Sequence, residues 1–100
     1  MFGVFVAESW HKSGVHFGNG ETFVVSVSPT FVVHKWSETN AYYAIGKADF
    51  IAVGGGSNFA LWLDESFLHG SSKPCETFNS PALASAPEFA VASVEVWGFA

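Results

Sequence analysis

One short glycine-rich segment, residues 18–21, carries the side chain best placed for chemistry. Its sequence is Gly-Asn-Gly-Glu. Two glycines around a turn-forming residue allow backbone conformations with positive φ, so a tight loop can present Glu21 at the start of a strand. The carboxylate would there accept backbone hydrogen bonds or contact a partner. The structural alternative is that Glu21 ties down its own turn.

The single cysteine, Cys75, is the second candidate, for redox chemistry. A reactive thiol needs a lowered pKa and exposure to solvent. Lys73 would favour the thiolate and the adjacent Glu76 would oppose it, and the chain has no second cysteine to resolve a sulfenic acid. We therefore expect a small apolar residue that anchors an irregular loop. One cysteine also excludes an internal disulfide and a multi-thiolate zinc site.

The remaining polar residues form no recognisable catalytic, metal or nucleotide motif. The run Gly54-Gly55-Gly56 lacks the spacing of a phosphate-binding loop and is read as a turn between strands. The four histidines have no metal-ligand spacing: His11, His16, His34 and His69. Those at 34 and 69 fall in strand-like segments. Because no base, orienting group and oxyanion site occur together, the sequence predicts no enzyme, metal or cofactor.

Composition excludes several classes of function. The chain has 100 residues, of which 49% are hydrophobic and 13% charged, against about 25% charged in an average soluble domain. Such a chain is not intrinsically disordered. Its net charge of −5 argues against binding to nucleic acid and against docking on an anionic membrane. No apolar run approaches the length of a membrane span. Because nothing indicates secretion, we expect the protein in a reducing compartment, the cytoplasm.

Short apolar runs of alternating pattern must position these residues. They predict strands at Phe2–Ala7, Glu21–Ser28, Thr30–Trp36, Ala41–Ile45, Asp49–Val53, Phe59–Leu63, Phe67–Gly70 and Phe89–Phe99. Tight breaks between them favour antiparallel hairpins, and Ser71–Pro87 reads as a long irregular loop. No segment has a helical period over three turns. The fold class is mainly β, an antiparallel sandwich or partly open barrel.

Eight aromatic residues in or beside these segments are expected to form the core. A platform that stacks on a ligand is the alternative interpretation. They are Trp10, Trp36, Trp62, Trp97, Phe23, Phe31, Phe59 and Phe99.

The order of several sequence words resembles a known family. The words are ESW, GNGETFVVSVSP, the stretch from VVHKW to VGGG, FALWLDESFLHGSS, CETF and EVWGF. Together they resemble the C-terminal part of the TLDc domain, which is found in oxidation-resistance proteins. The resemblance covers essentially the whole chain and departs from the usual pattern at Asn19 and Ser57.

This resemblance implies a β-sandwich of two antiparallel sheets with a few peripheral helices. It also implies protection against oxidative stress and binding to the vacuolar-type proton ATPase. Within the glycine-rich segment, the family's functional pair maps onto Gly20 and Glu21. The family domain's N-terminal helices and first strands have no counterpart here, so residues 1–100 are expected to be a partial domain. Uncovered strands would then favour self-association.

The predicted function is therefore a non-catalytic interaction module that contributes to oxidative-stress resistance and regulates the vacuolar-type ATPase. One alternative is an oxidant-handling enzyme acting through Cys75 or the Glu21 loop. Another is a truncated domain without independent function. The expected compartment is the cytoplasm, and the resemblance also allows the nucleus, mitochondria or organelle surfaces.

Overall fold

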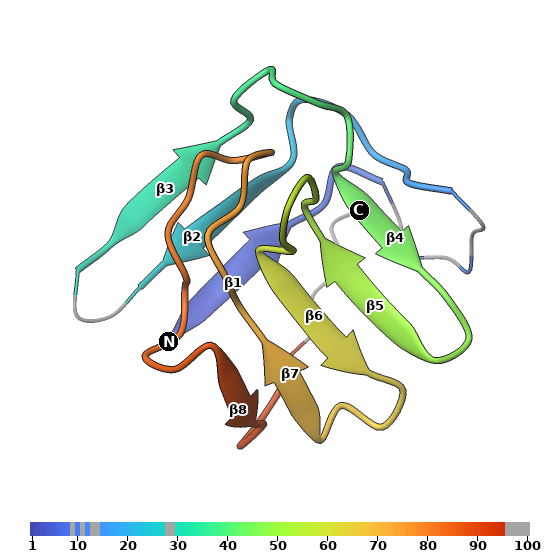
Figure 1. The fold of residues 1–100 in the computed structure, drawn as a ribbon, viewed down its shortest axis with the longest axis vertical. Helices are drawn as coiled ribbons and strands as arrows, with labels where there is room; N and C mark the ends of the chain where they lie inside the picture. The colour runs from blue at the N-terminus through green and yellow to red at the C-terminus, as the bar shows by residue number, and fades with distance from the viewer. Residues whose placement is uncertain (9, 11, 13–14, 28–29, 96–100) are drawn as a thin grey trace.

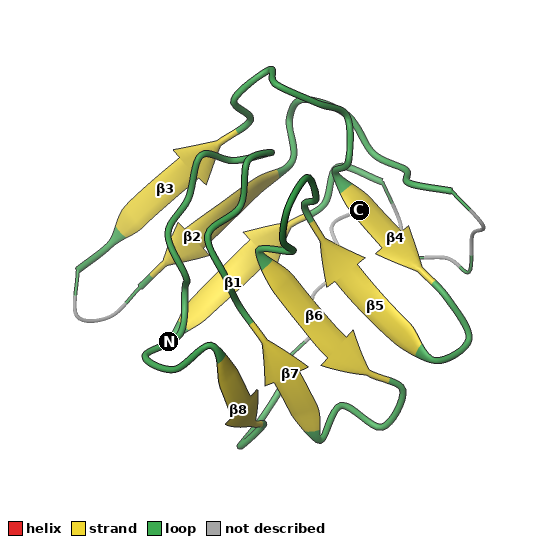
Figure 2. Ribbon diagram, viewed as in Figure 1, coloured by secondary structure: helices red, strands yellow, loops and turns green. Residues whose placement is uncertain are grey.

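Two antiparallel sheets form the molecule, and no helix occurs among the described residues (Figures 1 and 2). The computed structural model describes residues 1–8, 10, 12, 15–27 and 30–95. The three-stranded sheet has the order β1-β2-β3, and the five-stranded sheet has the order β4-β5-β6-β7-β8. The predicted class, an antiparallel β-sandwich, is thus confirmed. Its strands are β1 (Phe2–Phe5), β2 (Phe23–Ser26), β3 (Val32–Lys35), β4 (Ala44–Gly46), β5 (Phe50–Val53), β6 (Leu61–Asp64), β7 (His69–Ser71) and β8 (Glu88–Ala90).

The core lies between the sheets because alternate side chains of the inner strands point the same way. In β6, Leu61 and Leu63 are buried while Trp62 and Asp64 are partly exposed on the other face. Val24 of β2 and Val53 of β5 are fully buried in the same cluster. Three side chains of the irregular loop after β7 complete the cluster: Cys75, Phe78 and Leu83.

The β6–β7 hairpin differs in detail from its prediction, which put the turn at Asp64-Glu65-Ser66. Asp64 belongs to β6. Its backbone carbonyl accepts a hydrogen bond from Phe67 N at 3.1 Å, and its side chain accepts one from Leu68 N at 3.0 Å. These bonds hold Phe67 at a φ of 56° and place the turn one or two residues later.

The last predicted strand, Phe89–Phe99, is wrong in extent. Only Glu88–Ala90 forms a strand among the described residues of this stretch. The backbone N of Val91 leaves the sheet pattern and donates to the carbonyl of Leu68 at 2.8 Å. Trp97 and Phe99 lie outside the described residues, as does His11.

The prediction that the aromatic residues form the core also needs correction. Phe31 is 67% exposed, because it precedes the edge strand β3 and no further strand covers it. The other described members are half-buried, and of these Trp10 packs against the core while Trp62 lies on the outer face of β6: Trp10, Phe23, Trp36, Phe59 and Trp62. The fully buried large aromatic side chain is Phe78, from the loop.

Candidate functional site

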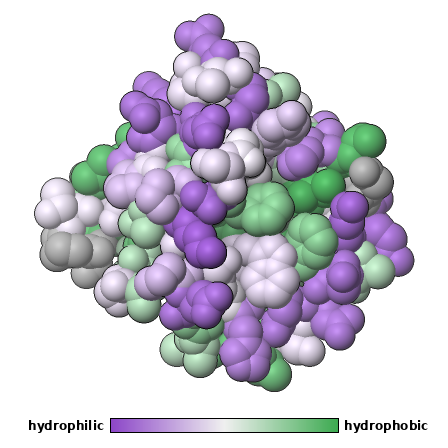
Figure 3. All heavy atoms as spheres, viewed as in Figure 1, coloured by the Kyte–Doolittle hydropathy of each residue, from purple (hydrophilic) through white to green (hydrophobic). Residues whose placement is uncertain are grey.

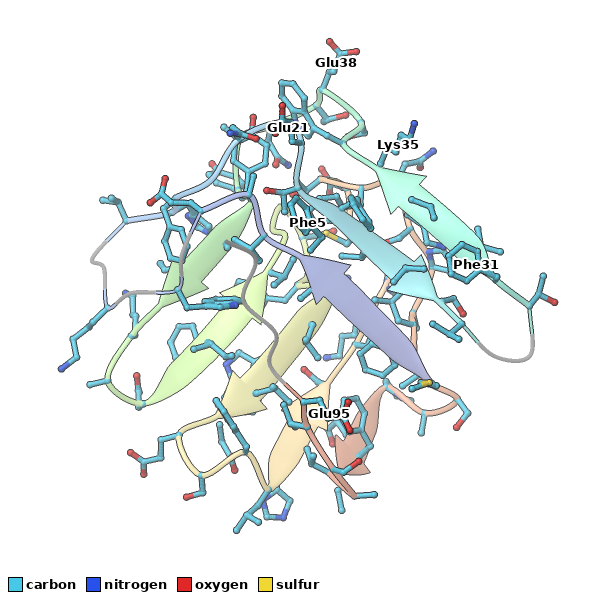
Figure 4. All side chains as sticks on the ribbon, turned by 180° about the vertical axis from the view of Figure 1, so that it is seen from behind. Phe5, Glu21, Phe31, Lys35, Glu38 and Glu95 are labelled. Atoms are coloured by element: carbon cyan, nitrogen blue, oxygen red, sulfur yellow. The ribbon has the colours of Figure 1, made fainter. Side chains whose placement is uncertain are left out.

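The glycine-rich segment, residues 18–21, forms a closed loop that leads into β2; we call it the Gly-Glu loop. Gly18 has a φ of 108°, and a Cβ there would lie 3.1 Å from the Cβ of Tyr43. The side-chain oxygen of Asn19 accepts a hydrogen bond from Glu21 N at 2.8 Å, and the backbone carbonyl of Asn19 accepts one from Thr22 N at 3.1 Å. These bonds fix the turn from within and leave the Glu21 side chain exposed (Figure 4).

Gly20 serves a different purpose from Gly18. Its backbone lies against the indole of Trp36, where a Cβ would overlap the ring carbons. The indole N–H of Trp36 donates to the carbonyl of Asn40 at 2.6 Å, and the ring packs edge-on against Tyr43 at 5.4 Å. The Gly-Glu loop therefore rests on an aromatic support that is itself held in place.

A buried polar relay extends this support to two other loops. The Thr77 hydroxyl donates to the side-chain oxygen of Asn40 at 2.7 Å and accepts from Gly55 N at 2.9 Å. Thr77 is fully buried. The backbone N of Ser37 also donates to the carbonyl of Thr77 at 2.8 Å. The relay thus joins the end of β3, the glycine turn 54–56 and the loop that carries Cys75.

Cys75 lies in this same loop assembly and is 3% exposed. Its thiol is 3.6 Å from the carbonyl of Gly55, and a Cβ at Gly54 would lie 2.5 Å from the sulfur. Cys75 and Ser80 exchange two backbone hydrogen bonds, at 2.9 and 3.0 Å. The sulfur therefore fills space under the glycine turn rather than facing solvent.

The glycine turn itself is closed by a carboxylate of the chain. Glu76 Oε1 accepts hydrogen bonds from the Ser57 hydroxyl at 2.9 Å and from Ser57 N at 3.3 Å. A Cβ at Gly56, where φ is 94°, would lie 3.0 Å from the Glu76 carboxyl carbon. A carboxylate of the chain itself thus occupies the space beside the glycine turn.

The histidine–carboxylate pair of His69 and Asp64 lies apart from these loops, in the β6–β7 hairpin. His69 Nδ1 is 3.2 Å from Asp64 Oδ2. Partial desolvation raises the pKa of Asp64, but hydrogen bonds from Leu68 and His69 outweigh it, so the pKa stays below its ordinary value. Among the described residues, no three His, Cys, Asp or Glu side chains gather as a metal site.

Sequence reasoning singled out Gly20, Glu21 and Cys75 as candidates and missed the residues that join their loops. The structure brings the Gly-Glu loop and the Cys75 loop to one end of the sandwich, but through Trp36, Asn40 and Thr77. The Thr77–Asn40 pair is separated by 37 positions, which no local pattern reveals. A weak signal was available in Asn40, since an asparagine between predicted strands favours turns whose backbone it caps.

The fold and these loops define the class: a β-sandwich that displays a braced set of loops at one end. The chain belongs to the TLDc domain family, whose model matches residues 1–100. It is 40% identical over 100 residues to oxidation resistance protein 1 of Bos taurus, covering 99% of this chain and 12% of that protein. It is also 40% identical over 100 residues to nuclear receptor coactivator 7 of Homo sapiens, covering 99% of this chain and 11% of that protein. The chain thus spans about one eighth of the length of these relatives.

Proposed function

We propose that the chain is a non-catalytic protein-interaction module that contributes to resistance against oxidative stress through the vacuolar-type proton ATPase. The observation that carries the proposal is the exposed Glu21 carboxylate, displayed on a loop that Asn19 closes and Trp36 supports. A loop whose backbone is already fixed loses little conformational entropy on binding, so a braced loop suits recognition. The membership of oxidation-resistance proteins in the family supports the physiological role.

The arrangement of loops supports binding rather than catalysis. The backbone N–H of Glu21 donates to Asn19, and within the described part of the chain no hydrogen bond joins the Glu21 carboxylate to a nucleophile or base. The Cys75 thiol is buried, whereas reactive cysteines are partly exposed. Within the residues that the structure describes, no helix has the length and apolar character of a membrane span. We assign the module to the cytoplasm, with the peripheral sector of the pump as its partner.

A titration of the purified pump tests this proposal. We expect the folded chain to change ATP hydrolysis saturably, and Glu21→Gln to weaken that effect about tenfold, as for a charged contact at an interface. Glu65→Gln is the matched control, because it removes the same charge from an exposed turn in the β6–β7 hairpin. No effect of the folded chain on the pump, or equal loss in both variants, would overturn the proposal.

Cys75→Ser separates binding from oxidant chemistry. Because the thiol is buried, we expect the variant to keep the protection that the chain gives to cells under peroxide stress, with a stability loss of about 1–2 kcal/mol. Peroxide consumption by the purified chain that disappears in Cys75→Ser, with the fold intact by circular dichroism, would favour the oxidant-handling alternative instead.

A further inference from the structure

The outer face of the five-stranded sheet, turned away from the core, carries a groove that the proposed function does not use. The register places Trp62, Ser71 and Glu88 in one cross-strand row on this face. Small Ser71 between two long side chains leaves a hollow. The groove has a volume of about 490 Å³ and is lined by Trp62, His69, Gly70, Ser71, Glu88 and Phe89.

Aromatic rings form a continuous floor beside this groove. The Trp62 and Phe50 ring centroids are 6.1 Å apart, and those of Phe50 and Phe59 are 6.3 Å apart. All three side chains are partly exposed. Figure 3 shows apolar and aromatic side chains gathered over β5 and β6 and bordered by hydrophilic ones. The indole of Trp62 therefore offers a flat face at the edge of an apolar area.

The charges around the groove are unevenly distributed. Glu88 is exposed and makes no ion pair within the part of the chain that the structure describes. The adjacent row places Asp64 beside His69, and the two side chains are bonded to each other. Lys73 lines a neighbouring hollow that shares Ser71 with the groove. The unpaired negative charge of Glu88 thus lies across Ser71 from Trp62, and the positive charge of Lys73 lies in the neighbouring hollow.

We propose that this groove docks a single arginine side chain of a protein partner, stacked on Trp62 and paired with Glu88. A guanidinium is planar, so it can lie on an indole and still present two N–H groups to a carboxylate. An ammonium group lacks this shape, which makes arginine the better fit than lysine. Lys73 repels a second basic residue, so the partner segment continues with neutral or acidic side chains.

This inference does not depend on the identity of the pump as partner. The groove shares no residue with the Gly-Glu loop, so either surface can be tested without the other. The hairpin beside the groove adds contact area, since Phe67 is 38% and Leu68 58% exposed. Exposed apolar side chains next to an unpaired charge are typical of protein interfaces rather than of small-ion sites.

A nuclear magnetic resonance titration of the ¹⁵N-labelled chain tests the groove. The probe is the blocked peptide acetyl-Gly-Arg-Gly-amide, and its control is the same peptide with citrulline, a neutral analogue of arginine. We expect saturable shifts in the millimolar range at the Trp62 indole N–H and at the amides of Ser71 and Glu88 with the arginine peptide. Citrulline should produce much smaller shifts.

Two variants and one control decide the outcome. Glu88→Gln should weaken binding about fivefold or more, because it removes a charge-assisted hydrogen bond. Trp62→Leu should abolish the preference for arginine over citrulline. Glu38→Gln removes the same charge beside the Gly-Glu loop (Figure 4) and should leave binding within about twofold. Equal effects of Glu88→Gln and Glu38→Gln, equal binding of the two peptides, or no saturable shift at the groove would each overturn the proposal. Because Glu88 is exposed, its variant remains informative even if Trp62→Leu fails to fold.

Discussion

The two sheets differ in how completely they are covered. In the three-stranded sheet, Val24 is fully buried, but Val32 and Val33 of β3 are each 40% exposed although successive side chains point to opposite faces. Both faces of β3 therefore meet solvent. The inner face of the five-stranded sheet is covered more completely, because the loop that carries Cys75 and Phe78 packs there together with Val24 of β2. The difference shows that side chains of an irregular loop can complete a core between two sheets.

The three-stranded and five-stranded sheets, the open and covered halves, are connected by two sets of backbone hydrogen bonds that we call the seam. Phe17 and Ala44 exchange two backbone hydrogen bonds, at 2.7 and 3.1 Å, and so tie the approach to β2 to the first strand of the other sheet. Ser37 N to Thr77 O forms a second link, after β3. The Gly-Glu loop lies between these links in sequence. Its geometry therefore depends on both halves, whereas every residue that lines the groove at Trp62 comes from β6, β7 and β8 of the five-stranded sheet.

Removal of a core side chain should separate the halves most clearly. Phe78→Ala in the loop is expected to lower the free energy of unfolding by about 3–5 kcal/mol, because Phe78 is 1% exposed and leaves a cavity. Val33→Ala in β3 should cost under about 1 kcal/mol, since its side chain is 40% exposed. Urea unfolding followed by tryptophan fluorescence measures both. Equal losses would mean that the covered and open halves are not energetically different.

The polar relay should have the next largest effect. Thr77→Val keeps the shape of the side chain but leaves Gly55 N and the Asn40 side chain without their buried partner. We expect a loss of about 1–3 kcal/mol. Thr39→Val is the control, because Thr39 is exposed and its hydroxyl accepts from the Ser37 hydroxyl, not from the Ser37 N–H that bonds to Thr77. A Thr77→Val variant as stable as the control would show that the relay does not brace the loops.

These contrasts indicate which features the sequence could reveal. Hairpins arise from local alternation, so β2–β3 and β4–β5 follow directly from the paired runs Glu21–Ser28 with Thr30–Trp36 and Ala41–Ile45 with Asp49–Val53. Gly18 was found for the right reason, a positive φ in a turn. Gly20 was found for a different reason from the one observed, because its close approach to Trp36 is a tertiary contact.

Features that depend on distant contacts escaped prediction. The Pro-rich loop gave no periodic signal, yet Phe78 and Leu83 within it are core residues. Burial there is decided by what the loop folds over, not by its own pattern. The exposure of Phe31 has the same origin, since an aromatic residue beside a strand is buried only where another element covers it. Sequence alone does not show which strand will be at the edge.

We expect the chain to self-associate through the open edge of β3, because this edge strand is apolar and exposed. Val33→Lys places a charge on this strand, and we expect it to raise the dissociation constant of self-association about tenfold while changing stability little. Sedimentation equilibrium measures the effect. Val94→Lys is the control, because Val94 is 41% exposed but lies outside the strands. A fully monomeric wild-type chain at high concentration would refute this prediction.

The seam offers the smallest effect, a dependence of stability on pH. His16 precedes the Phe17–Ala44 link, its ring lies 4.8 Å from that of Tyr42, and its Nε2 is buried without a hydrogen-bond partner within the described structure. Burial, followed by repulsion from Lys47, lowers the pKa of His16 below its ordinary value of 6.5. The unfolded chain therefore binds the proton more readily. The contribution of His16 to stability is complete above pH 6.5 and is lost as the pH falls below that value.

His16→Gln should accordingly flatten the fall in melting temperature between about pH 7.5 and pH 5.5, and Lys47→Gln should flatten it less, because it removes only the secondary cause. Thermal melts of the three proteins at each pH measure this. An unchanged slope in His16→Gln would refute the assignment of the pH dependence to His16.

If the open half unfolds first, the change should be greatest in amide exchange at β1, β2 and β3, since the seam holds those strands against the rest. Protection lost uniformly across both sheets would show that the sandwich opens as one cooperative unit and that its unequal covering has no consequence for dynamics.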